Sequence, residues 1–344
     1  MGRAGTERSP VRSVNEGRRM GLAPTPVAPT REFPARGGLE AVRRARGPES
    51  PKWGATILFL LPAGLLLVVF LVYPAIYTVL LSFNRGRNGV FNEWVGLDNY
   101  ARLFSDASFI NLSSFPPSGA LWNNILWIVF YTSIVIFLGL IIAVVAARVR
   151  YESVIKAIVF IPMSIAATAL AVIWKFVYSP DTNIGLLNAI LGAVGVAPVS
   201  WLGDPELVNY ALIAVGIWGS VGFATVILSA AVKGIPAEVI ESARVEGATE
   251  RQIFFRMILP MVSLPMSVLA VTLVINVIKL FDLIFVMTGG GPGKSSQVIA
   301  MTMFQQAFEA GQYGFGSAVA VVMLVLLIPI MVFNVRRFRT AAVT

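Results

Sequence analysis

The sequence predicts an all-α, polytopic membrane protein with six transmembrane helices and a long helical loop on its inner side. Of the 344 residues, 56% are hydrophobic and 13% are charged, whereas soluble domains carry about 25% charged residues. Six apolar runs each reach the roughly 20 residues that cross a bilayer as a helix. None alternates with a period of two, and only helices or closed barrels satisfy the backbone in lipid. The predicted spans are residues 53–81, 122–147, 157–178, 208–232, 262–287 and 316–335.

The residue types that are missing exclude several kinds of chemistry. The chain has no histidine and no cysteine, so disulfides, Cys/His zinc sites, His-based triads and thiol nucleophiles are ruled out. The predicted spans also contain no acid–base cluster that resembles an active site. We therefore expect a protein that is not an enzyme and has no catalytic residue, metal ion or cofactor of its own.

The chain divides into a polar tail, residues 1–52, and a transmembrane domain, residues 53–344. The tail contains eleven Lys and Arg residues and five Glu residues, with many Pro and Gly residues between them. No apolar period runs through it, so we expect a disordered, basic arm that is solvated in the cytoplasm.

The distribution of positive charge predicts the orientation. Twenty-one Lys and Arg residues lie in the tail, in the loops 148–156 and 233–260, and at the C-terminus, against four in the alternate loops. The positive-inside rule places the richer side, and with it both termini, in the cytoplasm. Topology thus accounts for the net charge of +9, and no nucleic-acid partner is expected.

Two of the outer loops have recognisable local patterns. In the loop 82–121, Tyr100, Leu103 and Phe104 share one helical face, as in a helix that lies at a membrane interface. The loop after the fifth span has a glycine-rich turn at residues 288–294. It is not a phosphate loop, because the Walker pattern requires glycine where this chain has Thr288.

The inner loop 233–260 predicts two short amphipathic helices joined by a tight turn. Pro236 suits a first helical turn, and Gly247 suits a helix end that needs positive φ. Thr249 and Gln252 have the spacing of a capping box for the second helix, and Pro260 ends that helix or leads it into the next span. Such a hairpin either rests on lipid headgroups or docks into a groove of a cytoplasmic partner.

This loop resembles the "EAA" coupling loop of binding-protein-dependent ABC importer permeases. The family pattern is Glu-Ala-Ala, three residues, Gly, nine residues, Ile, one residue, and Leu-Pro. Here Ser replaces the second residue and Met replaces Ile, and the spacing is unchanged. The matching residues are Glu241, Ser242, Ala243, Gly247, Met257, Leu259 and Pro260.

The resemblance covers about residues 55–340. Within the family, the chain most resembles the carbohydrate-type permeases, such as those of the maltose and glycerol-phosphate systems. Residues 96–100, 288–292 and 306–308 carry the subfamily marks. The resemblance implies a subunit in a bacterial or archaeal cytoplasmic membrane, surrounded by lipid. Its implied partners are a second homologous permease, an ABC ATPase dimer, an extracytoplasmic solute-binding protein and a sugar.

The resemblance also implies roles for individual residues. Glu241 is expected to be an acidic anchor at the ATPase groove, and Ala243 to keep the helix thin enough to enter it. Gly247 permits the turn between the two helices. Leu259 and Pro260 connect the hairpin to the fifth span.

Five residues are candidates for the substrate path. Asn276, Lys279 and Asp282 are spaced by three along the predicted fifth span, and ionisable groups inside a span commonly mark a pathway. Lys279 and Asp282 are equally compatible with a neutralising pair one turn apart. Trp218 and Asn209 in the fourth span are weaker candidates. Mono-, di- and oligosaccharides and related polyols all remain open as substrates.

Other transport functions remain as alternatives. Within the same family, an amino acid, a polyamine or glycerol phosphate is the rival substrate. A stand-alone channel or secondary transporter would require inverted repeats or an ion site at the midplane, and neither is evident in the sequence.

Overall fold

The computed structural model describes residues 53–87, 89–113 and 115–341. The predicted tail, residues 1–52, lies outside the described residues. The described residues fall into two units that divide between Gly64 and Leu65. In the described ranges the secondary structure is helical, apart from three isolated β-bridges that join pairs of residues.

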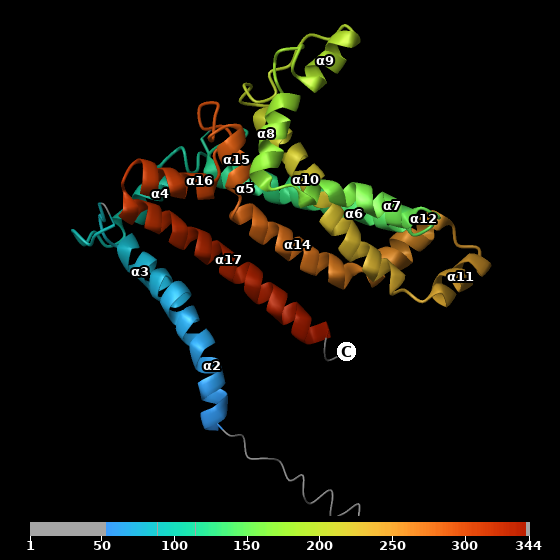
Figure 1. Cartoon of the computed structure of the whole chain (residues 1–344), viewed down its shortest axis with the longest axis horizontal. Helices are drawn as coiled ribbons and strands as arrows, with labels where there is room; N and C mark the ends of the chain where they lie inside the picture. The colour runs from blue at the N-terminus through green and yellow to red at the C-terminus, as the bar shows by residue number, and fades with distance from the viewer. Residues whose placement is uncertain (1–52, 88, 114, 342–344) are drawn as a thin grey trace, which may run out of the picture. The chain divides into compact units, whose positions relative to one another are not determined.

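The helices follow the predicted order of six apolar segments (Figure 1). The first comprises α2 (Trp53–Leu67), η1 (Val68–Val72) and α3 (Tyr73–Ser82), and the second α5 (Ala120–Leu126), η2 (Trp127–Thr132) and α6 (Ser133–Ala146). The third comprises α7 (Glu152–Phe160), η3 (Ile161–Ser164) and α8 (Ala167–Val177), and the fourth is α10 (Val208–Lys233). The fifth comprises α12 (Glu250–Ile253), η4 (Phe254–Ile258), α13 (Leu259–Met261), α14 (Ser263–Ile278) and α15 (Asp282–Met287), and the sixth is α17 (Tyr313–Ala341). The remaining helices are α4 (Asp98–Ser105), α9 (Leu186–Ala193), α11 (Ala237–Val245), α16 (Ile299–Phe304) and η5 (Gln305–Glu309).

Four helices in the described part of the chain are long and apolar enough to cross a membrane, and six if each bent pair is one span. The apolar runs 157–178 and 262–287 predicted helical spans but not the bends that the structure shows in the third and fifth spans. The third bends by 97° between residues 164 and 167, and the fifth bends by 67° near Val262. In the third span the backbone at Ile165 and Ala166 is extended, a few residues after Pro162, which cannot donate a helical hydrogen bond.

The fifth span has a second interruption further along. Helix α14 ends at Ile278, and α15 begins only at Asp282. Residues 279–281 between them are not helical. Both bent spans therefore present irregular backbone inside the helical bundle, which is tolerated at membrane depth where it is buried in protein or lines a cavity.

The fourth span packs against the second, third and fifth spans, and α6 and α10 run side by side (Figure 1). Gly222 of α10 makes the close approach to the third span possible. A Cβ atom at this position would lie 2.4 Å from the carbonyl oxygen of Val159. The main hydrophobic core forms around these contacts, with Leu212, Leu228 and Leu269 among its buried residues.

Helix α4 packs on α17, which corrects the expectation of a helix resting on a membrane interface. Leu103 is fully buried in a second core cluster with Phe109 and Phe315. Tyr100 is half-buried and shares a hydrogen bond with Ser82. Of the predicted face, only Phe104 remains exposed.

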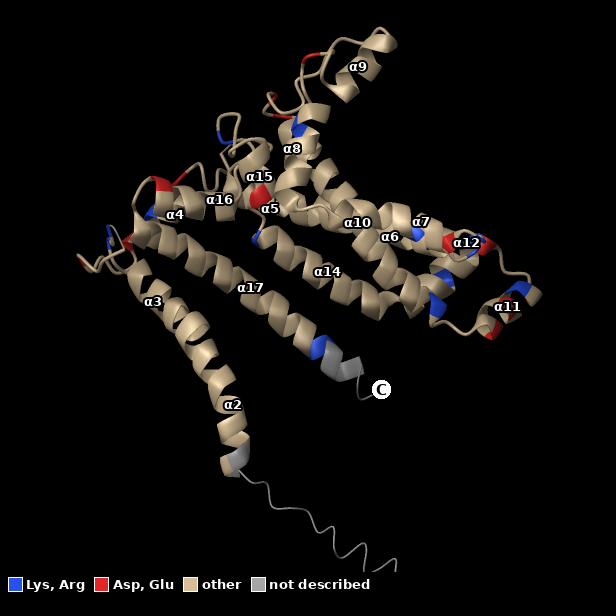
Figure 2. Ribbon diagram, in the orientation of Figure 1, with Lys and Arg blue, Asp and Glu red and all other residues tan. Residues whose placement is uncertain are grey.

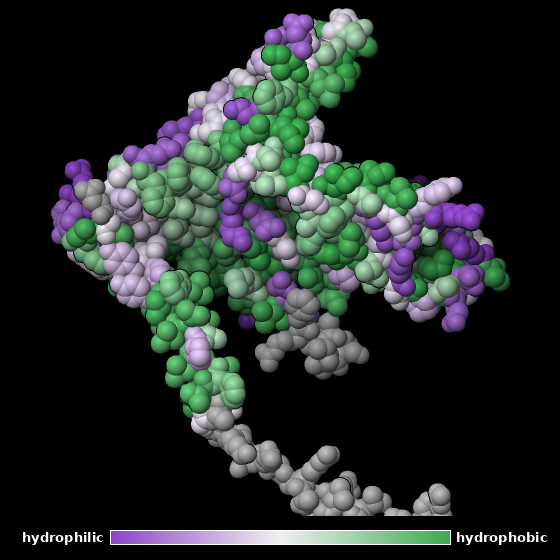
Figure 3. Space-filling view, in the orientation of Figure 1, coloured by the Kyte–Doolittle hydropathy of each residue, from purple (hydrophilic) through white to green (hydrophobic). Residues whose placement is uncertain are grey.

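Charged and apolar side chains separate along the helices. Figure 2 shows charged residues gathered around α11 and α12 and in the loops at the far ends of the bundle, with almost none on the helical shafts between them. The same shafts are predominantly hydrophobic in the view of Figure 3. This is the surface pattern of a bundle whose middle faces lipid.

Candidate functional site

The inner loop forms the predicted helical hairpin. Helix α11 begins after Pro236, which lies just before the helix rather than in its first turn. Gly247 has φ +84°, and the amides of Gly247 and Ala248 donate to the carbonyl oxygens of Arg244 and Ala243. These two bonds form a Schellman motif that closes the helix with a glycine in the left-handed region.

The second helix of the hairpin begins with the predicted capping box. The amide of Gln252 donates to Thr249 Oγ1 at 3.3 Å, and the amide of Thr249 donates to Gln252 Oε1 at 2.8 Å. Helix α12 then widens into a π-helical turn, η4, immediately before Pro260. A wide turn at this point accommodates a proline whose ring conflicts with the preceding helical carbonyls.

The motif residues lie on two sides of the hairpin. Glu241 and Ser242 are exposed, on the side of α11 that faces away from the bundle. Ala243 is 7% exposed and packs with the partly buried Met257 and Leu259 against the main core. The structure thus uses Ala243 as the point where α11 approaches its own chain, and Pro260 lies in α13 at the junction with the fifth span.

Two groups of ion pairs surround this hairpin, and neither was predicted from the sequence. Glu250 pairs with Arg148 at 2.5 Å and with Arg244 at 2.8 Å. Glu152 pairs with Lys233 at 2.9 Å and also with Lys156. The hydrogen bond to Glu250 raises the pKa of Arg244 above its ordinary value, so this guanidinium remains charged.

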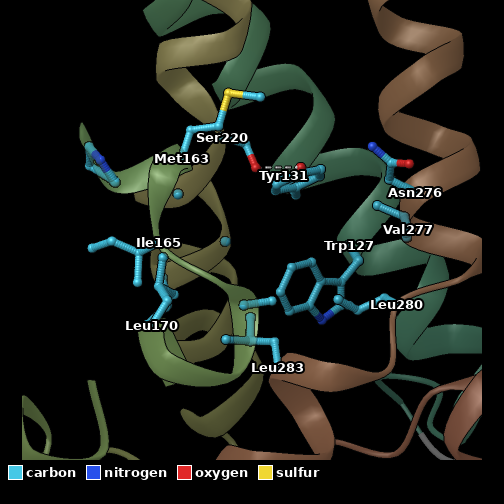
Figure 4. Close-up of a pocket in the computed structure, with 15 residues that line it drawn as sticks. Trp127, Tyr131, Met163, Ile165, Leu170, Ser220, Asn276, Val277, Leu280 and Leu283 are labelled. Carbon is cyan, nitrogen blue, oxygen red and sulfur yellow. Dashed lines mark hydrogen bonds between the residues drawn. The ribbon is translucent and has the colours of Figure 1, made fainter. Parts of the chain in front are cut away.

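A cavity of about 190 Å³ lies where the two broken spans meet the second and fourth spans. Figure 4 shows Met163, Ile165 and Leu170 on one side, Asn276 and Leu280 on the other, and Trp127 between them. The full lining comprises Trp127, Tyr131, Pro162, Met163, Ile165, Ala167, Leu170, Val215, Gly216, Gly219, Ser220, Asn276, Val277, Leu280 and Leu283.

The cavity combines aromatic faces with a few neutral polar groups. Tyr131 donates a hydrogen bond to Ser220 at 2.8 Å, and Asn276 adds an amide from α14. Trp127 is 1% exposed, and its Nε1 has no hydrogen-bond partner among the described residues. The lining residues that the structure describes carry no charge. Apolar walls with a few placed polar groups are typical of sites for small neutral ligands.

Of the three candidates in the fifth span, the structure brings only Asn276 to this cavity. The expected helical stripe was wrong, because Lys279 caps the end of α14 and Asp282 begins α15. Neither residue lines the cavity, where Leu280 and Leu283 take the corresponding places. No ion pair between Lys279 and Asp282 occurs in the described part of the chain, so the neutralising pair was also wrong.

The two candidates from the fourth span lie elsewhere. Trp218 packs edge-on against Trp174, with ring centroids 5.5 Å apart, outside the cavity lining. Asn209 is buried near the glycine-rich turn, and its Nδ2 donates to Ser295 O at 2.8 Å and to Asn123 Oδ1 at 3.1 Å. Asn209 therefore holds this turn in place, together with Asn123, which also donates to Ser295 O.

Trp127, Tyr131 and Ser220 were not among the residues predicted from the sequence. Trp127 and Tyr131 are four residues apart and share a helical face, which was the available signal. That signal was not decisive, because a helix that is apolar on every side does not reveal which face is turned inward.

Comparison with known proteins places these features in a family. Residues 107–338 match the family described as "Binding-protein-dependent transport system inner membrane component". The osmoprotective compounds uptake permease protein GgtC of Synechocystis sp. is 46% identical over 286 residues, which cover 82% of this chain and 98% of that protein. The alpha-glucoside transport system permease protein AglF of Rhizobium meliloti is 40% identical, with 88% of each chain covered.

A solved structure with the same fold was also found. It is a bacterial ABC transporter involved in the import of the acidic polysaccharide alginate, with a TM-score of 0.69 and 23% sequence identity. The match covers 88% of this chain and 99% of that chain. At this level of identity, the likeness supports the fold.

Proposed function

This chain belongs to the family of binding-protein-dependent transport system inner membrane components, and we propose that it is the sugar-translocating permease subunit of an ATP-driven importer. The chain is a transport component rather than an enzyme, and a separate ABC ATPase dimer hydrolyses ATP. A second homologous permease completes the membrane part, and an extracytoplasmic binding protein delivers the sugar.

The observation that carries the choice of substrate is the neutral, aromatic cavity at the broken spans. Sugars offer apolar ring faces and many hydroxyl groups but no charge, which suits Trp127, Tyr131 and Asn276. Amino acids, polyamines and glycerol phosphate carry charges that are costly to bury without a charged partner, so the lining disfavours them. The relative named for alpha-glucoside transport supports a small neutral glucoside.

The hairpin is the proposed point of coupling. Helix α11, with Glu241 exposed, docks into a groove of the ATPase and moves when that dimer closes. The movement passes through Pro260 into the fifth span, whose far end contributes Asn276 and Leu280 to the cavity. The cavity of about 190 Å³ is smaller than the roughly 300–1,000 Å³ of typical ligand sites. It therefore widens at the breaks in the third and fifth spans when sugar enters.

The proposed topology follows from the positive charges. The loops 148–156 and 233–260, the C-terminus and the basic tail, residues 1–52, lie in the cytoplasm, and the transmembrane domain, residues 53–344, crosses the membrane six times. The glycine-rich turn and α9 then face the extracytoplasmic side, where the binding protein docks.

Uptake into proteoliposomes tests this function. The full complex, with its binding protein outside and ATP inside, is offered radiolabelled trehalose, maltose, spermidine, glutamate and glycerol 3-phosphate in turn. We expect ATP-dependent uptake of an α-glucoside that disappears when the binding protein is omitted. Uptake of charged solutes alone, or uptake without ATP, would overturn the assignment.

A further inference from the structure

The residues that flank α11 on both sides are ion-paired to the same neighbouring segment. This segment, residues 147–156, joins the second span to the third and begins α7; we call it the bracket segment. Arg148 of the bracket segment pairs with Glu250, just after the turn of the hairpin. Glu152 pairs with Lys233, the last residue of α10 before the hairpin. Helix α11 therefore lies between two attachment points on the bracket segment. The first point is the Arg148–Glu250 ion pair and the second is the Glu152–Lys233 ion pair.

Glu250 is the centre of the first point. Its Oε2 accepts from Arg148 Nη2 at 2.5 Å, and its Oε1 accepts from Arg244 Nε at 2.8 Å. One carboxylate thus links the second span, the end of α11 and the start of α12. Glu250 also lies in the first turn of α12, where a negative charge is favoured by the helix dipole.

Glu152 is the centre of the second point. It accepts from Lys233 at 2.9 Å and from Lys156 one helical turn further along, and Ser229 of α10 donates to it at 3.4 Å. The carboxylate of Glu152 is less exposed than that of Glu250, at 20% against 49%. This point joins the third and fourth spans at their inner ends.

The exposure of these groups argues for a positioning role. An isolated exposed ion pair contributes little to stability, whereas several charges in one network fix geometry better. The bracket segment connects the second and third spans, and these two spans supply Trp127, Met163 and Leu170 to the cavity. Because Glu250 and Lys233 tie the two flanks of α11 to the bracket segment, a displacement of α11 would move the parts of the cavity lining that the second and third spans supply.

We propose that the bracket segment transmits the movement of α11 to the second and third spans through the Arg148–Glu250 and Glu152–Lys233 ion pairs. Coupling then has two routes, one through Pro260 into the fifth span and one through the bracket segment. Arg148 and Glu250 are positioning residues in this scheme. The inference rests on the proposed function, because it requires α11 to be the part that the ATPase moves.

The test compares charge variants of the reconstituted complex in proteoliposomes. In Arg148→Glu the attraction between residues 148 and 250 becomes a repulsion, while the exposed face of α11 is unchanged. The triple variant Arg148→Glu/Arg244→Glu/Glu250→Arg inverts the three charges around residue 250, so the attractions among them are kept. Arg150→Glu is the matched control, since Arg150 is exposed in the same segment and makes no ion pair with the described residues.

Three quantities are measured for each complex: co-purified ATPase, ATP hydrolysed, and trehalose taken up. We expect Arg148→Glu to retain its ATPase but to lower trehalose uptake per ATP by roughly five-fold or more, the low end of coupling between sites. The triple variant should recover most of the wild-type ratio, and Arg150→Glu should match wild type.

Two results would overturn the proposal. One is an unchanged ratio of uptake to ATP in Arg148→Glu, and the other is loss of the ATPase from that variant, which would make the pair a docking contact. Failure of the proposed function would look different, because the wild-type complex itself would then lack the ATPase or ATP-dependent uptake.

Discussion

Gly247 sets the angle between the two helices of the hairpin. Its φ of +84° is one that only glycine adopts at low cost, and a Cβ atom there would meet nothing within 4 Å. A substitution is therefore penalised by backbone strain alone, about 1 kcal/mol for alanine. Substitutions at Gly247 therefore test the conformation of the turn without adding a steric clash.

We predict that Gly247→Ala weakens ATPase binding by roughly five-fold, the factor that about 1 kcal/mol corresponds to. Gly247→Asn should have a smaller effect, because asparagine tolerates the left-handed region better. Titration of the purified ATPase onto permease complexes in nanodiscs measures both affinities. Equal affinities for alanine, asparagine and wild type would show that the turn does not position α11.

Asn276 is the one predicted path residue that reaches the cavity. Asn276→Ala removes an amide that can bond a sugar hydroxyl, so we predict that KM for the transported sugar rises by up to ~10-fold, as expected for the loss of one hydrogen bond. Lys279→Ala is the matched control, since Lys279 is three residues away and outside the lining. If Asn276→Ala instead releases the ATPase, Asn276 supports the structure of the complex and is not part of the sugar path.

At the scale of helices, the sequence predicted six spans, the number in the described part of the chain if each bent pair is one span, but it did not predict where the spans break. The length of an apolar run reports that a segment can cross a membrane. It does not report the 97° bend after Pro162 or the interruption at residues 279–281, because proline and glycine also occur in straight spans. The breaks depend on how neighbouring helices pack, and they displaced Lys279 and Asp282 from the expected stripe.

Gly222 shows such packing most directly. A Cβ atom there would lie 2.4 Å from Val159 O and 2.9 Å from Phe160 Cα, both backbone atoms. We predict that Gly222→Ala destabilises the detergent-solubilised protein by about 1–3 kcal/mol, the range for overpacking. Thermal unfolding followed by tryptophan fluorescence measures the loss.

Gly192→Ala provides the control for this effect, because Gly192 lies in α9 with nothing within 4 Å of a new Cβ atom. Its melting temperature should equal or slightly exceed that of wild type. An unchanged melting temperature for Gly222→Ala would mean that the third and fourth spans separate more easily than their contact suggests.

For the whole molecule, the absence of cysteine allows a clean test of topology. Val194, after α9, is 70% exposed and Val245, at the end of α11, is 88% exposed. We predict that a membrane-impermeant maleimide added to intact spheroplasts labels Val194→Cys but not Val245→Cys. Permeabilised cells, in which both should react, are the control. The reverse labelling pattern would show that the chain has the opposite orientation in the membrane.

The two candidate sites differed in how far the sequence could predict them. The hairpin was predicted almost residue by residue, because Gly247, Thr249 and Gln252 act on their immediate neighbours in the chain. The cavity was not, because Trp127, Ser220 and Asn276 come from three spans that meet only in the folded bundle. Local chemistry can be read from one segment, and a shared cavity requires the packing of several.

The central claim is that this permease chain is driven by an ATPase that docks on α11. The most direct measurement is purification of the tagged chain from its own membranes in mild detergent, with the co-purifying subunits identified by mass spectrometry. Wild type is compared with Glu241→Lys and with Glu246→Lys. The second variant reverses an exposed charge at the residue that directly follows α11.

We predict that wild type and Glu246→Lys bring down an ABC ATPase and a second permease. Glu241→Lys should keep the second permease and lose the ATPase. A wild-type chain that purifies alone or as a homo-oligomer, or a Glu241→Lys variant that retains its ATPase, would contradict this account.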